Sequence, residues 1–315
     1  MTEPVALVPT ACALCGTCGN ARELYPANFT PEALNPTVFS ARRLPDRLHL
    51  RVVRCRGCGL VRSDPLPPAE LLARLYAASS LDYHDEVGSL RATYGRCLRR
   101  LRPAGAGGSL LEIGCGSGFM LDEALDQGFA QVAGVEPSGA AVVAASERVR
   151  ARIVVDVMRP GLFAPDSFDV VCMFQVLDHL PDPGAVIAEC VRVLRPGGRM
   201  LCLNHNVDAV SARLLGEASP IVDIEHTYLY NPRTMAALLA RHGLRVAWVR
   251  PVWNLYSLHY LVRLLPLPAA LKRPLLKTLA ASAAGRLRLC VPLGNLVALG
   301  VKPDGPSPSA ELRHA

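Results

Sequence analysis

A short stretch between residues 110 and 120 combines one carboxylate with three alternating glycines. It opens with an apolar run, 110–113, that predicts a buried strand, and it reads Glu112-x-Gly114-x-Gly116-x-Gly118 before a segment of helical character. Glycine in such a turn allows backbone conformations that a side chain forbids, and it lets a ligand lie directly against the main chain. The pattern therefore predicts a ligand-binding strand, turn and helix.

A second carboxylate, Glu136, ends the next apolar run, 22 residues after Gly114. A carboxylate at this position can accept hydrogen bonds from both ribose hydroxyls of a nucleoside ligand. A dinucleotide fingerprint would need a glycine at position 119, where this chain has Phe119. With the acid placed before the glycines, the stretch resembles motif I of the class I S-adenosylmethionine-dependent methyltransferases. The alternative is a glycine turn in some other doubly wound domain.

The resemblance implies a role for each residue around this turn. Glu112 and the three glycines would cradle the methionine end of S-adenosylmethionine, and Glu136 would bind its ribose. Pro137 would pack on the adenine face, and Asp156 would accept a hydrogen bond from the adenine amino group; alternatively, Asp156 is a solvated turn residue. Gln175 completes the predicted cofactor-binding set.

Two histidines are candidates for a general base. His179 follows the fourth expected strand, at the carboxyl edge where open α/β sheets bind ligands, and His226 lies beside Glu225 at a position that borders the acceptor pocket in the family resembled. Methyl transfer to oxygen or carbon needs a proton removed, whereas a nucleophilic amine needs no base. The alternative for His179 is a capping and packing role. The segment 204–206, Asn-His-Asn, would lie near the same acceptor.

Four cysteines near the N-terminus have the spacing of metal ligands. Two C-x-x-C-G motifs, with Cys12 and Cys15 in the first and Cys55 and Cys58 in the second, predict a closed tetrahedral site for structural zinc. Cys18 ends an overlapping motif and could replace Cys12. Four reduced cysteines in an irregular segment are the alternative. We predict a zinc ribbon that relies on the metal to fold.

The elements that carry these residues alternate along the chain, with apolar strand-like runs and helical segments following one another from 110 to 203. That order predicts an α/β fold with a mostly parallel sheet, and the resemblance, which covers roughly residues 72–302, implies a Rossmann-like sheet of seven strands with an antiparallel last strand, 295–302. We predict a zinc-ribbon module at 1–65, a methyltransferase domain at 66–302 and a disordered tail at 303–315.

Two segments could cover the cofactor or the acceptor. A helix predicted at 83–101 corresponds to a lid in the family, so Tyr76, Tyr83 or Tyr94 could touch the cofactor, although packing is equally expected. The Leu- and Ala-rich insertion 253–290 could pack over an apolar acceptor or rest on a membrane surface. We favour a lid, or a helix pair at a dimer contact, for this insertion.

Composition restricts the function further. The net charge of +7 comes mainly from arginine, and residues 1–10 lack the basic start of a signal peptide, so we expect a cytoplasmic protein without a transmembrane segment. We predict a methyltransferase, monomeric or homodimeric, acting on a small-molecule, sugar or natural-product acceptor, with O- or C-methylation ahead of N-methylation. The alternatives are an RNA methyltransferase whose ribbon arginines hold phosphates, against which no aromatic cluster accompanies them, and a non-catalytic scaffold of the same fold.

Overall fold

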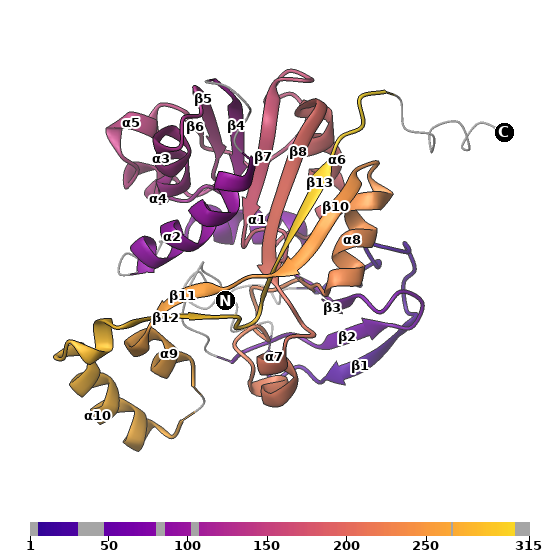
Figure 1. Ribbon diagram of the computed structural model, residues 1–315. Helices are drawn as coiled ribbons and strands as arrows, with labels where there is room; N and C mark the ends of the chain where they lie inside the picture. Colours follow the sequence, from indigo (N-terminus) through magenta and orange to yellow (C-terminus); the bar gives the residue numbers. More distant parts are fainter. Residues whose placement is uncertain (1–5, 31–46, 80–85, 102–106, 266, 306–315) are drawn as a thin grey trace.

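A seven-stranded sheet forms the centre of the computed structural model, which describes residues 6–30, 47–79, 86–101, 107–265 and 267–305 (Figure 1). In sheet order its strands are β10 (Arg245–Pro251), β13 (Asn295–Val301), β8 (Leu194–His205), β7 (Phe168–Phe174), β4 (Ser109–Ile113), β5 (Gln131–Val135) and β6 (Ile153–Val154). The five strands from β8 to β6 pair in parallel, whereas β13 is antiparallel to both of its neighbours. The expected mostly parallel sheet of seven strands is confirmed.

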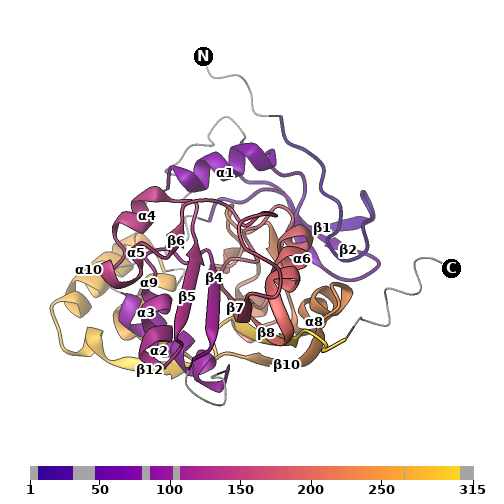
Figure 2. The same ribbon diagram turned by 90° about the horizontal axis from the view of Figure 1, so that it is seen from above.

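Helices lie on both faces of this sheet (Figure 2). The helices of the described residues are α1 (Ala69–Ala77), α2 (Val87–Leu98), α3 (Phe119–Asp126), α4 (Gly139–Val143), α5 (Glu147–Arg150), α6 (Pro183–Val193), α7 (Val210–Leu215), α8 (Pro232–Arg241), α9 (Leu258–Leu264) and α10 (Ala269–Ala280), with 3₁₀ turns η3 (Arg99–Leu101), η4 (Gly216–Ala218) and η5 (Ala284–Arg286). Of these, α9 and α10 lie beyond the end of the sheet (Figure 1). The helix predicted at 83–101 corresponds to α2 and η3, and Tyr83 lies outside the described residues.

The strands divide their side chains between two apolar cores. Leu111 and Cys202 belong to the core that α6 and α8 cover, while their neighbours Leu110 and Leu201 belong to the core under α2 and α3. All four side chains are almost completely buried. Because successive residues of a strand point to opposite faces, an uninterrupted apolar run is what a sheet covered on both sides requires.

The N-terminal cysteine motifs lie on a second, smaller sheet. It contains β1 (Ala21–Tyr25), β2 (Val52–Cys55), β3 (Val61–Ser63) and β9 (Tyr228–Leu229) in that order. Strand β2 begins at Val52, where its pairing with both β1 and β3 begins. The last strand, β9, lies more than 160 residues after β3 in the sequence and pairs with it. The ribbon therefore shares its sheet with the segment that follows His226.

The insertion predicted at 253–290 contains a hairpin as well as helices. Strands β11 (Asn254–Ser257) and β12 (Arg288–Val291) pair with each other, and between them the chain forms α9, α10 and η5. We call residues 254–291 the hairpin-helix module; Figure 1 shows its helices projecting from one end of the sheet. Of the predicted tail, residues 306–315 lie outside the described residues.

Candidate functional site

A cavity of about 960 Å³ lies at the carboxyl ends of the parallel strands. A cavity of this size is at the upper end of small-ligand pockets and has room for a nucleoside cofactor beside a second molecule. Of the predicted site residues it is lined by Glu112, Gly114, Gly116, Glu136, Pro137, Asp156, Gln175, His179 and His226. Gly118 does not line it and instead precedes α3 as its N-cap. Strand ends that meet at one edge of the sheet thus bring both predicted sets of residues to one cavity.

The glycine turn is shaped as its sequence predicts. Gly114 has φ +66°, and a Cβ built on it would lie 2.5 Å from Cγ2 of Val176. Gly118 has φ +69° and starts α3 in a left-handed conformation. A residue with a side chain would be strained at both positions, and at Gly114 it would also displace the loop that leads to His179.

Glu136 is held at the end of β5 by two backbone donors. The N–H of Gly116 donates to Oε2 at 2.8 Å, and the N–H of Ser138 donates to Oε1 at 2.9 Å. Burial raises the pKa of Glu136, while these two donors lower it in part. Each oxygen retains a lone pair toward the cavity, so the carboxylate fits the two ribose hydroxyls that the sequence assigned to it.

Glu112 has a buried carboxylate oxygen that lacks a partner. Within the described residues its Oε2 makes no hydrogen bond, and the residue is only 3% exposed. Burial raises the pKa of Glu112 well above its usual value, and the charge of Glu136 raises it further. Both polar atoms of the Gln175 side chain are likewise buried without a partner among these residues. An ammonium group and a polar ligand edge would satisfy these atoms, so the cavity fits an amino acid attached to a nucleoside.

Asp156 is already engaged by a neighbour. Arg159 donates to Oδ2 of Asp156 through two nitrogens, at 2.7 and 3.0 Å, and lowers the pKa of the carboxyl group. Asp156 therefore lines the cavity and also forms an ion pair with Arg159. Pro137 lines the cavity as well.

Asp178 is a completely buried carboxylate that binds His205, one of the residues lining the cavity. Its Oδ2 accepts from Nδ1 of His205 at 2.6 Å, and its Oδ1 accepts from the Asn204 amide at 2.9 Å. Burial alone would raise the pKa of Asp178, but the charge of His179 and the hydrogen bond from His205 hold it well below its usual value. Within the described residues only Nδ1 of His205 has a partner, so Nε2 remains for a proton from a bound molecule.

The two predicted bases meet His205 in one cluster. The ring of His226 lies 4.5 Å from that of His205 and 4.9 Å from that of His179, measured between centroids. Nδ1 of His226 donates to the Ile221 carbonyl at 2.9 Å, and Nδ1 of His179 donates to the Glu225 carbonyl at 3.1 Å. Since a carbonyl can only accept, both rings present an unprotonated Nε2.

Burial lowers the pKa of both predicted bases. For His179 burial outweighs the opposing charge of Asp178, and for His226 burial and the neighbouring charges of His205 and His179 together hold the pKa well below its usual value. Tyr76, from α1, places its hydroxyl 3.0 Å from Nδ1 of His179. Burial raises the pKa of Tyr76 well above its usual value, so its hydroxyl keeps its proton.

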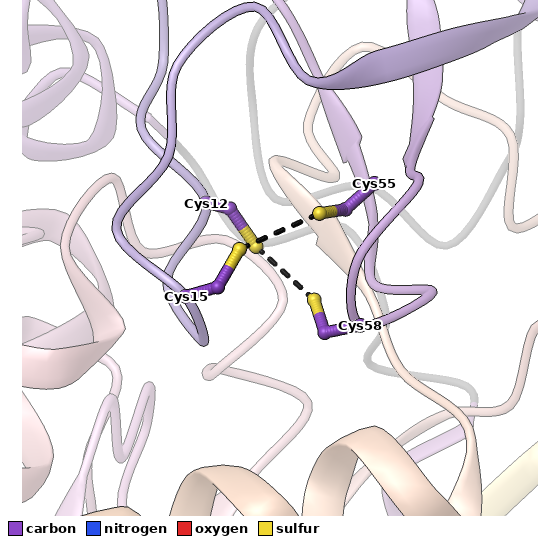
Figure 3. Close-up of side chains that lie close together, drawn as sticks. All are labelled: Cys12, Cys15, Cys55 and Cys58. Carbon is purple, nitrogen blue, oxygen red and sulfur yellow. Dashed lines mark hydrogen bonds between the residues drawn. The ribbon is translucent and has the colours of Figure 1, made fainter.

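Four cysteine sulfurs meet at the ribbon, as Figure 3 shows. The Sγ atoms of Cys12 and Cys58 are 3.3 Å apart and those of Cys15 and Cys55 are 3.5 Å apart, without a disulfide. Tetrahedral zinc, with bonds of ~2.3 Å to sulfur, sets sulfurs ~3.8 Å apart. All four sulfurs lie within 4.8 Å of one another, so they fit such an ion. Cys18 is exposed and is not part of this group, so Cys12 is the fourth cysteine.

The family described as "Methyltransferase domain" matches residues 88–248, just over half of the chain. The chain belongs to the class I S-adenosylmethionine-dependent methyltransferase family. This methyltransferase domain contains the glycine turn, Glu136 and the histidine cluster, whereas the cysteine ribbon and the hairpin-helix module lie outside the matched residues.

Curated relatives share one part of the methyltransferase. The ubiquinone biosynthesis O-methyltransferase of Pseudomonas entomophila is 35% identical over 120 residues, and that of Stutzerimonas stutzeri is 34% identical over 119 residues. Each alignment covers 35% of this chain and 51% of the relative. The chain therefore spans about half the length of the curated relatives it matches.

A solved structure shares the fold of the methyltransferase. A methyltransferase in complex with the Haloferax volcanii Trm112 methyltransferase activator is 21% identical, with a TM-score of 0.52. The match covers 73% of this chain and 97% of the other. It supports the Rossmann-like architecture and nothing finer.

Sequence reasoning missed the Asp178–His205 pair of the methyltransferase. Asp178 directly precedes His179 and His205 is the last residue of β8, but 27 positions separate the two. Their juxtaposition depends on the parallel pairing of β7 with β8, which aligns the two strand ends. An Asp and a His at the ends of two adjacent expected strands was the signal that could have found the pair.

Proposed function

We propose that this protein transfers a methyl group from S-adenosylmethionine to a hydroxyl group of a small-molecule acceptor. The observation that supports it best is the hydrogen bond of 2.6 Å between the buried Asp178 and His205, because His205 lines the same cavity as Glu112, with its unpartnered oxygen, and Glu136. A hydroxyl is a weak nucleophile at neutral pH, so a site built around an activated imidazole suits it better than an amine. The O-methyltransferase relatives agree with this choice.

The residues of this chain perform binding, orientation and proton transfer. When bound, S-adenosylmethionine supplies an electrophilic methyl group on a sulfonium, so the protein's main task is alignment, which can contribute on the order of 7 to 11 kcal/mol. Nε2 of His205 accepts the acceptor's hydroxyl proton as the new oxygen–carbon bond forms and the sulfur–carbon bond breaks. Asp178 keeps the ring oriented and stabilises the imidazolium. His179 and His226, the bases expected from sequence, would then hold the acceptor through their Nε2 atoms.

The same cluster could hold a metal ion, since ligand atoms of Asp178, His179 and His226 lie within 4.8 Å of one another. We favour proton transfer because both oxygens of Asp178 already accept hydrogen bonds, from Asn204 and His205. A ligand carboxylate would have to weaken those bonds to bind a cation.

The basic ribbon supports RNA binding poorly. Arg62 is only 1% exposed, and it donates to Thr10 and lies 3.5 Å from Asp64 inside the ribbon. Arg51 donates to the Asp64 carbonyl. Arg62 is thus not available to phosphate groups, whereas Arg51 is exposed and is only partly engaged within the protein. Arg42 and Arg43, which the RNA alternative also invoked, lie outside the described residues.

Calorimetric titration of S-adenosylmethionine and of its demethylated product tests the proposal. We expect micromolar binding by the wild type and loss of about 100-fold in affinity in Glu136→Ala, since a carboxylate bonded to two hydroxyls contributes about 3 kcal/mol. Glu147→Ala, which removes an exposed glutamate on α5, is the matched control. A well-folded, zinc-loaded wild type that binds neither compound would refute the cofactor assignment and favour a scaffold.

The acceptor is tested separately. Purified protein saturated with S-adenosylmethionine would be screened against phenols and sugar hydroxyls, with formation of the demethylated product as the readout. We expect hydroxyl acceptors to support turnover and their methyl ethers to fail. Turnover confined to amines would overturn O-methylation while leaving the cofactor assignment intact.

A further inference from the structure

The hairpin-helix module, residues 254–291, exposes an unusual share of the apolar surface. Of the fourteen large hydrophobic side chains exposed among the described residues, five lie in the module and two more lie directly beside it, at positions 253 and 293. They are Trp253, Leu265, Leu271, Leu275, Leu287, Leu289 and Leu293. Scattered exposed leucines are ordinary, but half of them on one short segment indicates a contact surface.

The same module carries charge of one sign only. The sequence has no aspartate or glutamate between Glu225 and Asp304. The cations within the module are Arg263, Lys272, Arg273, Lys277, Arg286 and Arg288. A surface that combines exposed leucines with unbalanced positive charge is complementary to a membrane surface, in which a layer of anionic headgroups covers an apolar interior.

Helix α10 has an apolar side and a basic side. Leu271, Leu275 and Leu279 are spaced four residues apart and therefore lie along one face; Leu279 is buried at 9% exposure, whereas Leu271 and Leu275 are 57% and 38% exposed. Arg273 and Lys277 are exposed and lie about half a turn away, on the opposite side of the helix. The helix therefore combines exposed leucines on one side with cations on the other, an arrangement typical of amphipathic helices that lie in a membrane interface.

The module also has an inner side that belongs to the cavity. Leu261 and Leu264 of α9 and Leu265 after it line the same cavity as the histidine cluster. Contact of the outer side with a surface would therefore place the apolar end of the cavity next to that surface. Among the described residues no helix is long and apolar enough to cross a membrane.

We propose that the hairpin-helix module docks the protein on an anionic membrane surface. A second copy of this chain is a poorer occupant, because face-to-face pairing would bring the cations of two modules together with no acid between them. Nucleic acid is also a poorer occupant, because α10 carries leucines and no aromatic ring on which bases could stack.

Sedimentation with lipid vesicles tests the docking, and it needs neither cofactor nor turnover. Wild-type protein would be mixed with vesicles of phosphatidylcholine alone or of phosphatidylcholine with an equal amount of phosphatidylglycerol, at low and high salt. We expect binding only to the anionic vesicles, and weaker binding at high salt.

Two variants divide the interaction into its parts. Arg273→Gln with Lys277→Gln should weaken vesicle binding by about 30-fold, as expected for two cations near an anionic surface. Leu271→Ser with Leu275→Ser should weaken it by on the order of tenfold or more. Arg241→Gln, an exposed cation on α8, should leave binding unchanged. Far-ultraviolet circular dichroism and the melting temperature would establish that each variant is folded.

Three results would overturn the proposal: no binding to anionic vesicles, equal binding to neutral and anionic vesicles, or wild-type affinity in both double variants. Light scattering separates one further outcome. A wild-type dimer that the leucine variant converts to monomer, without vesicle binding by either protein, would assign the surface to a second copy of the chain.

Discussion

At the scale of single residues, His205 and Asp178 have separable roles in the proposed chemistry. A positioned general base contributes about 100- to 10,000-fold to a rate. We expect His205→Asn to lower kcat by that amount and Asp178→Asn to lower it by less, because the imidazole remains but loses its orienting partner. The affinity for S-adenosylmethionine should stay within about twofold of the wild type in both, since neither residue contacts Glu112 or Glu136.

His179→Asn and His226→Asn are the matched comparisons for that experiment. If these residues hold the acceptor, their main effect should be on KM for the acceptor rather than on kcat. An equal kcat loss at all three histidines would contradict the assignment of the base to His205.

The two buried histidines also predict how stability depends on pH. The pKa values of His179 and His226 in the folded protein are lowered, chiefly by burial, so below about pH 6.5 the unfolded chain binds more protons than the folded one. Stability is therefore present at neutral pH and falls as pH drops below about 6.5, by up to about 1.4 kcal/mol per pH unit for each histidine. Urea unfolding at several pH values between about 7.5 and about 5.5 measures this slope.

The variant His226→Gln should reduce that slope, whereas His259→Gln, a histidine of α9 outside the cluster, should not. Asp178 does not obscure the effect, because its lowered pKa makes its contribution disappear only at much lower pH. A slope unchanged in His226→Gln would mean that this ring is not held neutral in the folded protein.

At the scale of elements, the turn between β4 and α3 requires glycine for two reasons at once. A Cβ at Gly114 would meet Val176 at 2.5 Å, and φ of +66° adds a strain of about 1 to 2 kcal/mol. We expect Gly114→Ala to lower the melting temperature and to abolish cofactor binding in the calorimeter. Gly139→Ala provides the control, because a Cβ there meets open space at the start of α4, and it should be neutral or stabilising by up to about 1 kcal/mol.

At the scale of the whole molecule, the ribbon is coupled to the acceptor end of the cavity. The N–H of Ser63 on β3 donates to the Thr227 carbonyl, and its hydroxyl donates to the carbonyl of His226. The pairing of β3 with β9 continues this contact. We infer that zinc in the cysteine site, besides folding the ribbon, supports the position of His226.

That inference predicts a split effect of losing the metal. Cys58→Ser should lower the zinc content measured by mass spectrometry, destabilise the protein and reduce turnover by more than tenfold, because a structural zinc site contributes folding energy directly. Cofactor affinity should change little, since Glu112 lies on β4 and Glu136 directly follows β5, both in the large sheet. Cys18→Ser, an exposed cysteine outside the cluster, is the control and should change none of these. Unchanged turnover in a zinc-free Cys58→Ser protein would show that the two parts are independent.

Residue spacing alone determined the cofactor end of this protein and its cysteine site. The glycine turn, Glu136 and the paired cysteine motifs are local patterns, in which strand, turn and ligand follow one another along the chain. All of the predicted cofactor residues except Gly118 line the cavity, and the four predicted cysteines meet in the sulfur cluster. The parallel strands are continuous apolar runs because the sheet is covered on both faces, so the fold class could also be predicted from the sequence.

Only the tertiary structure decided the acceptor end. The Asp178–His205 pair, the contact of Tyr76 with His179 and the sharing of β9 with the ribbon join residues 27, 103 and more than 160 positions apart. The exposure of Leu271 and Leu275, on the same face of α10 as the buried Leu279, likewise depends on how that helix packs on α9 and η5. Such contacts depend on strand pairing and helix packing rather than on local spacing, so the sequence named their members without showing which of them meet.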